Sequence, residues 1–273
     1  MSTQPGGRQR GFALVVVLWI VTLLALQVSI FNLSIRDASS LASNELAIAR
    51  GEALTAAGVE LAAAQLMPPE AAWHADGSTR EVSFGGARLY ITITDEAGRL
   101  DINELDDEVL ESLLRPFGRS AQTLAQWVGR NGRLLDASEL GRALDLPTSA
   151  VQSLARHLTV HGGDGKINPL VASREALLML PGVDAAEVER ALELRRRGGE
   201  SGPDVAQALS SVDKWLTERK GPAYRVEVVV RGDSEPAIGR AEAIILLAAD
   251  KAAPYRVLSW RYEASGGGPE RRD

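Results

Sequence analysis

The stretch Gly11-Phe-Ala-Leu-Val-Val-Val-Leu-Trp-Ile20 opens a run of 25 residues, 11–35, that contains no charged side chain and 19 apolar ones. Roughly 20 such residues cross a bilayer as a single helix. Arg8 and Arg10 precede the run, and basic residues favour the cytoplasmic side of a membrane. The sequence therefore predicts one membrane-spanning segment at 12–35, with a cytoplasmic N-terminus and the rest of the chain on the other side.

The helical pattern continues well past this segment. Residues 36–66 contain no proline and are rich in Ala, Leu and Glu, whereas Pro68-Pro69 follow directly. These are good helix formers, and proline ends a helix. We expect one helix over 12–66, with a periplasmic half at 36–66. A cleaved secretory signal ending near Ala38-Ser39-Ser40 is the alternative, but no helix break lies there.

Alternation with a period of two predicts strands on both sides of a long central region. Residues 80–95 read as a hairpin that turns at Gly85-Gly86, and the runs 224–231, 241–247 and 255–262 are β-branched or aromatic. Segments 80–99 and 221–263 are expected to form one antiparallel sheet packed on the long helix. The fold class is therefore α+β, and residues 264–273, which are rich in glycine, are expected to be a disordered tail.

Between the two groups of strands, residues 100–220 have a helical period. Four polar residues precede apolar helical runs and are predicted as N-caps, namely Asn103, Asp136, Thr148 and Asp184. Asp136 and Asp184 each have a Glu three residues later, which is the capping-box spacing. We expect a large all-helical insertion in the sheet domain.

The composition excludes several kinds of chemistry. The chain has 273 residues, no Cys, three His and a formal net charge of −6. It therefore has no disulfide, no thiol nucleophile and no Cys-ligated metal. The acidic balance argues weakly against nucleic acid as the main partner.

The remaining candidate sites are weak as catalytic motifs. His157 and His161 have the spacing that holds zinc on a helix, but no third ligand is evident. The loop Gly162–Lys166 lacks the spacing of a phosphate-binding loop. One oxygen-rich cluster has a composition that suits calcium but not the spacing of an EF-hand; its members are Asp95, Glu96, Asp101, Asn103, Asp106 and Asp107. We expect no enzymatic activity.

A helix-hairpin-helix turn is the strongest competing motif. Leu180-Pro-Gly-Val183 stands before a predicted helix, as in DNA-binding turns of this kind. However, Asp184 replaces the second glycine that would grip a phosphate, and Glu187 and Glu189 add negative charge. Arg195-Arg-Arg197 is better explained as a basic helix C-terminus. A membrane-anchored DNA-binding protein is therefore the alternative function, and a generic signal-anchored periplasmic protein is a third.

The N-terminus resembles a known signal. Gln9-Arg10-Gly11 followed by Phe12-Ala-Leu14 is similar to the class III signal of type IV pilin-like proteins. That resemblance implies a leader at 1–11, which prepilin peptidase removes between Gly11 and Phe12. Most of these proteins carry Glu at the fifth mature position, where this chain has Val16. An apolar residue there is typical of GspK, the large minor pseudopilin of type II secretion.

Two further stretches resemble the GspK family. Asp95–Asn103 is similar to its junction between strand and insertion, and Lys166–Asn168 through Leu180-Pro-Gly182 to its Ile-Asn…Leu-Pro-Gly stretch, although Pro169 departs from it. The resemblance implies a minor pseudopilin of Gram-negative bacteria that is held in the inner membrane with its main domain in the periplasm. It also implies a tip complex with other minor pseudopilins above the major pseudopilin fibre, and no nucleic acid as partner. Some family members bind calcium; no ligands for it can be assigned in this sequence, and no other cofactor is implied.

Overall fold

The structure is a computed structural model that describes residues 9–67, 73–198, 202–232, 237–247 and 254–264, without the side chains of 9–15, 25, 28–42 and 237. The chain divides into two compact units, Met1–Gly51 and Glu52–Asp273. The predicted leader lies largely, and the predicted tail almost wholly, outside the described residues.

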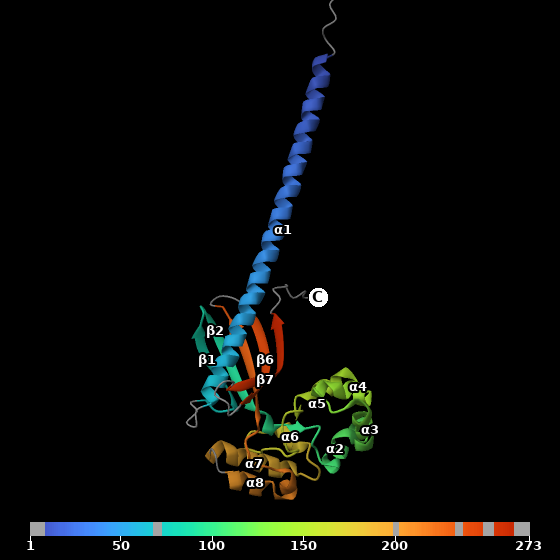
Figure 1. The fold of residues 1–273 in the computed structure, drawn as a ribbon, viewed down its shortest axis with the longest axis vertical. Coiled ribbons are helices and arrows are strands. Elements are labelled where there is room, and N and C mark those ends of the chain that lie inside the picture. The colour runs from blue at the N-terminus through green and yellow to red at the C-terminus, as the bar shows by residue number, and fades with distance from the viewer. Residues whose placement is uncertain (1–8, 68–72, 199–201, 233–236, 248–253, 265–273) are drawn as a thin grey trace, which may run out of the picture. The chain divides into compact units, whose positions relative to one another are not determined.

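The long helix predicted from 12 to 66 is present as α1, Gln9–Leu66. In the second unit, the last turns of α1 lie against the sheet (Figure 1). Leu54, Val59, Ala62 and Ala63 are buried there in one apolar core with the sheet. At Gly58 a Cβ atom would lie 2.7 Å from a methyl group of Val228, so glycine permits the close approach of helix and strand.

The sheet has five antiparallel strands in the order β1-β2-β5-β6-β7. Their bounds are β1 Asp76–Phe84, β2 Ala87–Asp95, β5 Ala223–Arg231, β6 Ala237–Leu247 and β7 Tyr255–Ala264. The predicted hairpin is confirmed: Gly85 and Gly86 both have positive φ, as a tight two-residue hairpin turn requires. Strand β1 begins at Asp76, earlier than the expected residue 80.

The insertion between β2 and β5 has its own apolar core, which includes Leu114, Leu140, Leu177 and Leu209. Among the described residues, this core and the core of sheet and α1 have no buried residue in common. The elements of the insertion are η1 Glu96–Gly98, β3 Leu100–Asp101, α2 Asp107–Leu114, η2 Arg115–Phe117, α3 Ala121–Asn131, η3 Ala137–Glu139, α4 Leu140–Leu144, α5 Thr148–Ala155, β4 Leu158–Thr159, α6 Arg174–Leu178, α7 Ala185–Gly198, α8 Gly202–Ala208 and η4 Ser210–Trp215.

Among the described residues of the insertion, β-pairing is confined to one short ladder and an isolated parallel bridge between Ile167 and Leu216. Strands β3 and β4 pair in parallel, with Leu100 opposite Leu158. Leu100 and Ile102 donate backbone hydrogen bonds to the carbonyls of His157 and Thr159. These segments are buried between helices, so their backbone groups need partners, and pairing with each other supplies them.

The predicted caps are partly confirmed. Asp136 accepts a hydrogen bond from the amide of Ser138, and Asp184 from that of Ala186. The cap predicted at Asn103 is wrong, because α2 begins at Asp107 and Asp106 caps it. Thr148 is already inside α5, whose N-cap is Pro147.

Candidate functional site

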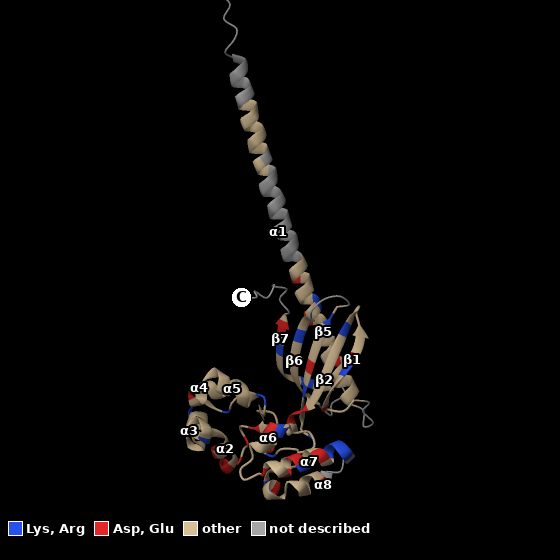
Figure 2. Cartoon of the chain, turned by 180° about the vertical axis from the view of Figure 1, so that it is seen from behind, with Lys and Arg blue, Asp and Glu red and all other residues tan. Residues whose placement is uncertain are grey.

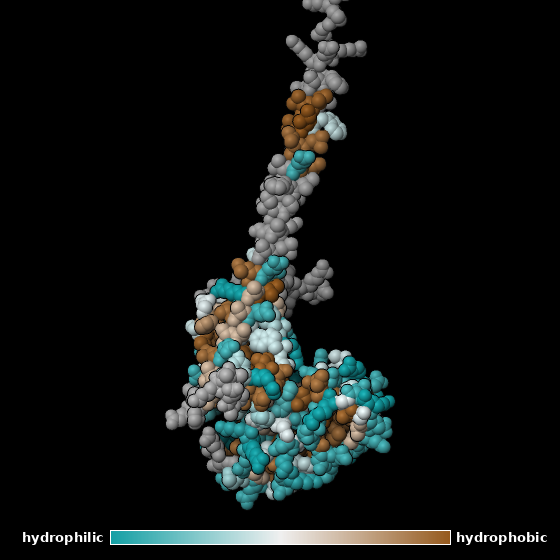
Figure 3. All heavy atoms as spheres, in the orientation of Figure 1, coloured by the Kyte–Doolittle hydropathy of each residue, from teal (hydrophilic) through white to brown (hydrophobic). Residues whose placement is uncertain are grey.

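The first unit presents an apolar helix surface. In α1 the large side chains of Val16–Ile20 are 41–68% exposed, and Figure 3 shows the apolar band that they form. Gly11 and Phe12, the residues of the predicted cleavage site, belong to α1, and the Phe12 side chain lies outside the described set. Within the described residues, no helix has an apolar stretch long enough to span a membrane.

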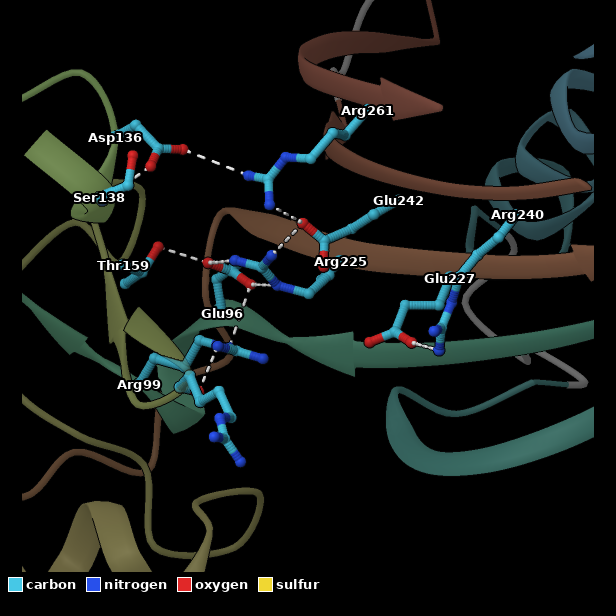
Figure 4. A network of polar contacts seen from close by, with 11 residues as sticks. Glu96, Arg99, Asp136, Ser138, Thr159, Arg225, Glu227, Arg240, Glu242 and Arg261 are labelled. Carbon is cyan, nitrogen blue, oxygen red and sulfur yellow. Dashed lines mark hydrogen bonds and ion pairs between the residues drawn. The ribbon is translucent and has the colours of Figure 1, made fainter. Parts of the chain in front are cut away.

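The second unit has a buried ion pair where the insertion meets the sheet. Glu96 of η1 is fully buried, and Arg225 of β5 binds it with two hydrogen bonds, Nε to Oε1 at 2.8 Å and Nη2 to Oε2 at 3.3 Å (Figure 4). The Thr159 hydroxyl also donates to Glu96, and the Arg99 Nε atom lies 3.5 Å from its Oε1 atom. Burial alone would lower the pKa of Arg225, but the charges and hydrogen bonds of Glu96 and Glu242 raise it above its ordinary value.

This pair continues outward as a chain of alternating charges. Arg225 Nη1 lies 2.6 Å from Glu242 Oε1, and Arg261 Nη1 lies 3.7 Å from the same oxygen. Arg261 Nη2 in turn lies 3.4 Å from Oδ2 of Asp136, the N-cap residue of η3 (Figure 4). Glu96, Glu242 and Asp136 face Arg99, Arg225 and Arg261, so the formal charges of these six residues balance. We call these six residues the junction network.

Asp95, the residue before Glu96, links the point where the chain enters the insertion to the point where it leaves. Its carboxylate accepts hydrogen bonds from the amides of Ala97 and Gly221, at 2.8 and 3.0 Å. Asp95 thus joins the start of the insertion to its end. Burial raises the pKa of Asp95, and the adjacent Glu96 adds to this, while the two hydrogen bonds act in the opposite direction.

Most side chains of the acidic cluster considered for calcium bind other groups of the chain. Asp101 accepts from the amides of Gly162 and Gly163, and Asp106 caps α2. Asn103 exchanges two hydrogen bonds with the backbone of Leu134. No group of three acidic or His side chains in the described part of the chain has the arrangement of a metal site.

The histidine pair does not lie on one helix, because α5 ends at Ala155 and β4 separates His157 from His161. The His157 ring bonds the Ser173 hydroxyl at 3.1 Å. In the neighbouring loop, the amides of Gly162 and Gly163, which a phosphate would use, already bind Asp101. The two histidines are therefore not placed one turn apart on a helix, as zinc binding by this pair would require.

The turn that resembles a helix-hairpin-helix lies between α6 and α7. Gly182 has a φ of +77° between α6 and α7, as a tight turn requires. However, Arg195 donates to the carbonyls of Pro169 and Ala172, and both Arg196 and Arg197 pair with Glu193. Figure 2 shows acidic residues along α7 and the basic ones at its C-terminal end. The basic run is thus engaged by its own domain.

The sequence pointed to Glu96 as a possible ligand and missed its true partner. Arg225 stands in the strand Ala223-Tyr-Arg-Val-Glu-Val-Val-Val-Arg231 and is only 8% exposed. The sequence signal that could have identified this pair was a charged residue within a Val-rich strand, next to the end of the insertion. Since buried charges in folded proteins are paired, a buried Arg225 implies an acidic side chain in contact with it.

Comparisons with known proteins agree with this architecture. No protein-family model and no curated protein matches the sequence. Among solved structures, the chain is similar to a chain in the crystal structure of the GspK-GspI-GspJ complex from the type 2 secretion system of enterotoxigenic Escherichia coli. The sequence identity is 14% and the TM-score 0.54, over 79% of this chain and 96% of that chain.

The chain therefore has an α+β, pilin-like fold: a long N-terminal helix, an antiparallel sheet and a helical insertion. Within that class, it is a GspK-like fold.

Proposed function

We propose that this protein is a minor pseudopilin of a type II secretion system that forms the tip of the pseudopilus with other minor pseudopilins. The GspK-like fold is the observation that supports it most directly. The long α1 and its exposed apolar side chains add a surface suited to a bilayer and to parallel helices of other subunits.

Val16 supports the tip position. A carboxylate inside a bilayer costs about 2.5–3.5 kcal/mol on insertion scales. In pilin-like fibres such a Glu pairs with the terminal amine of an adjacent subunit. A subunit with none above it gains no such contact, so an apolar residue avoids the cost. In this proposal the insertion caps the fibre, the complex primes pseudopilus assembly, and the fibre supports export of folded exoproteins.

Processing tests the proposal at its N-terminus. Coexpression with prepilin peptidase should remove residues 1–11 and leave Phe12 as the new N-terminus, read by intact-mass measurement. Gly11→Ala should block the cut, whereas the matched variant Gly7→Ala should be processed normally. Cleavage near Ser40 instead would contradict the proposal and favour a secretory signal.

Assembly tests the partners. Affinity purification of the full chain from detergent-solubilised inner membranes should recover other minor pseudopilins in a defined complex, and fractionation should place the chain in the inner membrane. The proposal assigns no cofactor, and the same purification with and without a chelator tests calcium. Recovery of DNA with a strong dependence on salt, in place of pseudopilins, would favour the alternative function.

A further inference from the structure

Two ion pairs join the insertion to the sheet, Glu96 with Arg225 and Asp136 with Arg261. The apolar core of the insertion and that of the sheet with α1 have no buried member in common among the described residues. Where two cores are separate and their interface is polar, relative motion of the two parts is the default expectation. The contacts at this boundary therefore decide how the insertion is held.

One end of the boundary is fixed. The chain enters the insertion after Asp95 and leaves it before Ala223, and Asp95 bonds the Gly221 amide at 3.0 Å. The side chains of Glu96 and Arg225 are 0% and 10% exposed. Breaking this pair would leave the fully buried Glu96 with Arg99, at 3.5 Å, in place of its two-point partner, which is costly inside the protein, so the pair stays closed.

The other end is weak. Arg261 of β7 and Asp136 of η3 are 57% and 43% exposed, and their closest atoms are 3.4 Å apart. Exposed pairs of this kind are worth little and are screened by salt. The same Arg261 also faces Glu242 of β6 at 3.7 Å. It therefore keeps one acidic neighbour when it leaves Asp136, which lowers the cost of opening.

From this difference in burial between the two ends we propose that the insertion rotates relative to the sheet about the Glu96–Arg225 pair, which we call the pivot. The Arg261–Asp136 pair, which we call the clasp, holds the insertion in its closed position against the sheet. The motion is a property of the domain 52–273 and is independent of the proposed role in secretion. Graded burial along a single chain of charges, from Glu96 out to Arg261, is what assigns pivot and clasp to opposite ends.

The absence of cysteine allows a direct test in the full chain in detergent. Ser83 in β1 and Gln122 in α3 are exposed, so Ser83→Cys and Gln122→Cys accept spin labels on the sheet and on the insertion. Pulsed electron paramagnetic resonance then measures the distribution of distances between the two labels. Arg261→Gln should add or enlarge a second population, raising the ratio of open to closed molecules about 1.4- to five-fold, the range for an exposed pair.

Arg240→Gln is the matched control. Arg240 pairs with Glu227 at 3.4 Å with 56% and 39% exposure, almost the values of the clasp, but both residues lie in the sheet. It should leave the distribution unchanged. Salt at about 1 M should shift the parent protein toward the distribution of Arg261→Gln. An identical distribution in the parent and in Arg261→Gln, or an equal shift in Arg240→Gln, would overturn the proposal.

Discussion

Glu96 and Arg225 are 129 positions apart in the sequence, yet their side chains form a two-point ion pair in which Glu96 has no exposed surface. Arg99 and Thr159 contact the same carboxylate. The carboxylate thus contacts two guanidinium groups and joins η1, β4 and β5.

Removing this carboxylate should be costly. Glu96→Ala leaves Arg225 and Arg99 without their shared counter-ion, and we expect a loss of about 3–5 kcal/mol in the free energy of unfolding. Urea unfolding of the full chain in detergent, followed by Trp fluorescence, measures it. The exposed pair Glu227–Arg240 is the control, and Glu227→Ala should cost at most about 1 kcal/mol. Equal losses in both variants would refute the assignment.

Asp95 should make stability depend on pH. Its folded-state pKa is raised by burial, so the unfolded chain releases this proton first as pH rises. The contribution of Asp95 is then fully present below its unfolded pKa of about 3.9 and is lost as pH rises through the folded value. Asp95→Asn keeps an oxygen for the Ala97 amide but does not ionise.

Unfolding free energies of Asp95→Asn and the parent protein, measured from pH 3.5 to 7, check this. The free energy of unfolding of the variant should increase relative to that of the parent protein as pH rises. A difference that stays constant with pH would show that the Asp95 pKa is not raised.

Two helix glycines should respond oppositely to alanine. Gly58→Ala gains helix propensity, but the new methyl meets Val228 at 2.7 Å, and overpacking of 1–3 kcal/mol leaves a net loss of about 1 kcal/mol. Gly129 in α3 has nothing within 4 Å of such a methyl, so Gly129→Ala should stabilise by about 0.5–1 kcal/mol. Thermal unfolding of both variants measures these changes. An increase in the stability of Gly58→Ala would contradict the close approach of α1 to β5.

Asn103 should matter more than a surface asparagine. Asn103→Ala removes two hydrogen bonds, of 2.9 and 3.0 Å, from the backbone of the buried Leu134, and we expect a loss of about 1–3 kcal/mol. Asn131 is exposed and bonds only within its own helix region, to the Trp127 carbonyl. Asn131→Ala should stay within about 0.5 kcal/mol in the same unfolding measurement. Similar losses at both positions would contradict the bridging role of Asn103.

The sequence by itself determined the elements and their order, because those signals are local. The uncharged run 11–35 and the absence of proline from residues 12–66 indicated α1, and alternation around Gly85-Gly86 indicated the hairpin. Helical periodicity between residues 100 and 220 indicated the insertion, although the two-residue ladder of β3 and β4 was too short to leave a periodic signal.

Only the tertiary structure decided what the polar residues do. Asn103 looked like a helix cap, but its partner Leu134 is 31 positions away. Asp95, Glu96 and Asp101 looked like ligands for a cation, but backbone amides and guanidinium groups satisfy them. The register that places Asp95 opposite Tyr224 also brings Arg225 to Glu96. Register between distant segments follows from packing of the whole domain, and spacing along the chain carries no record of it.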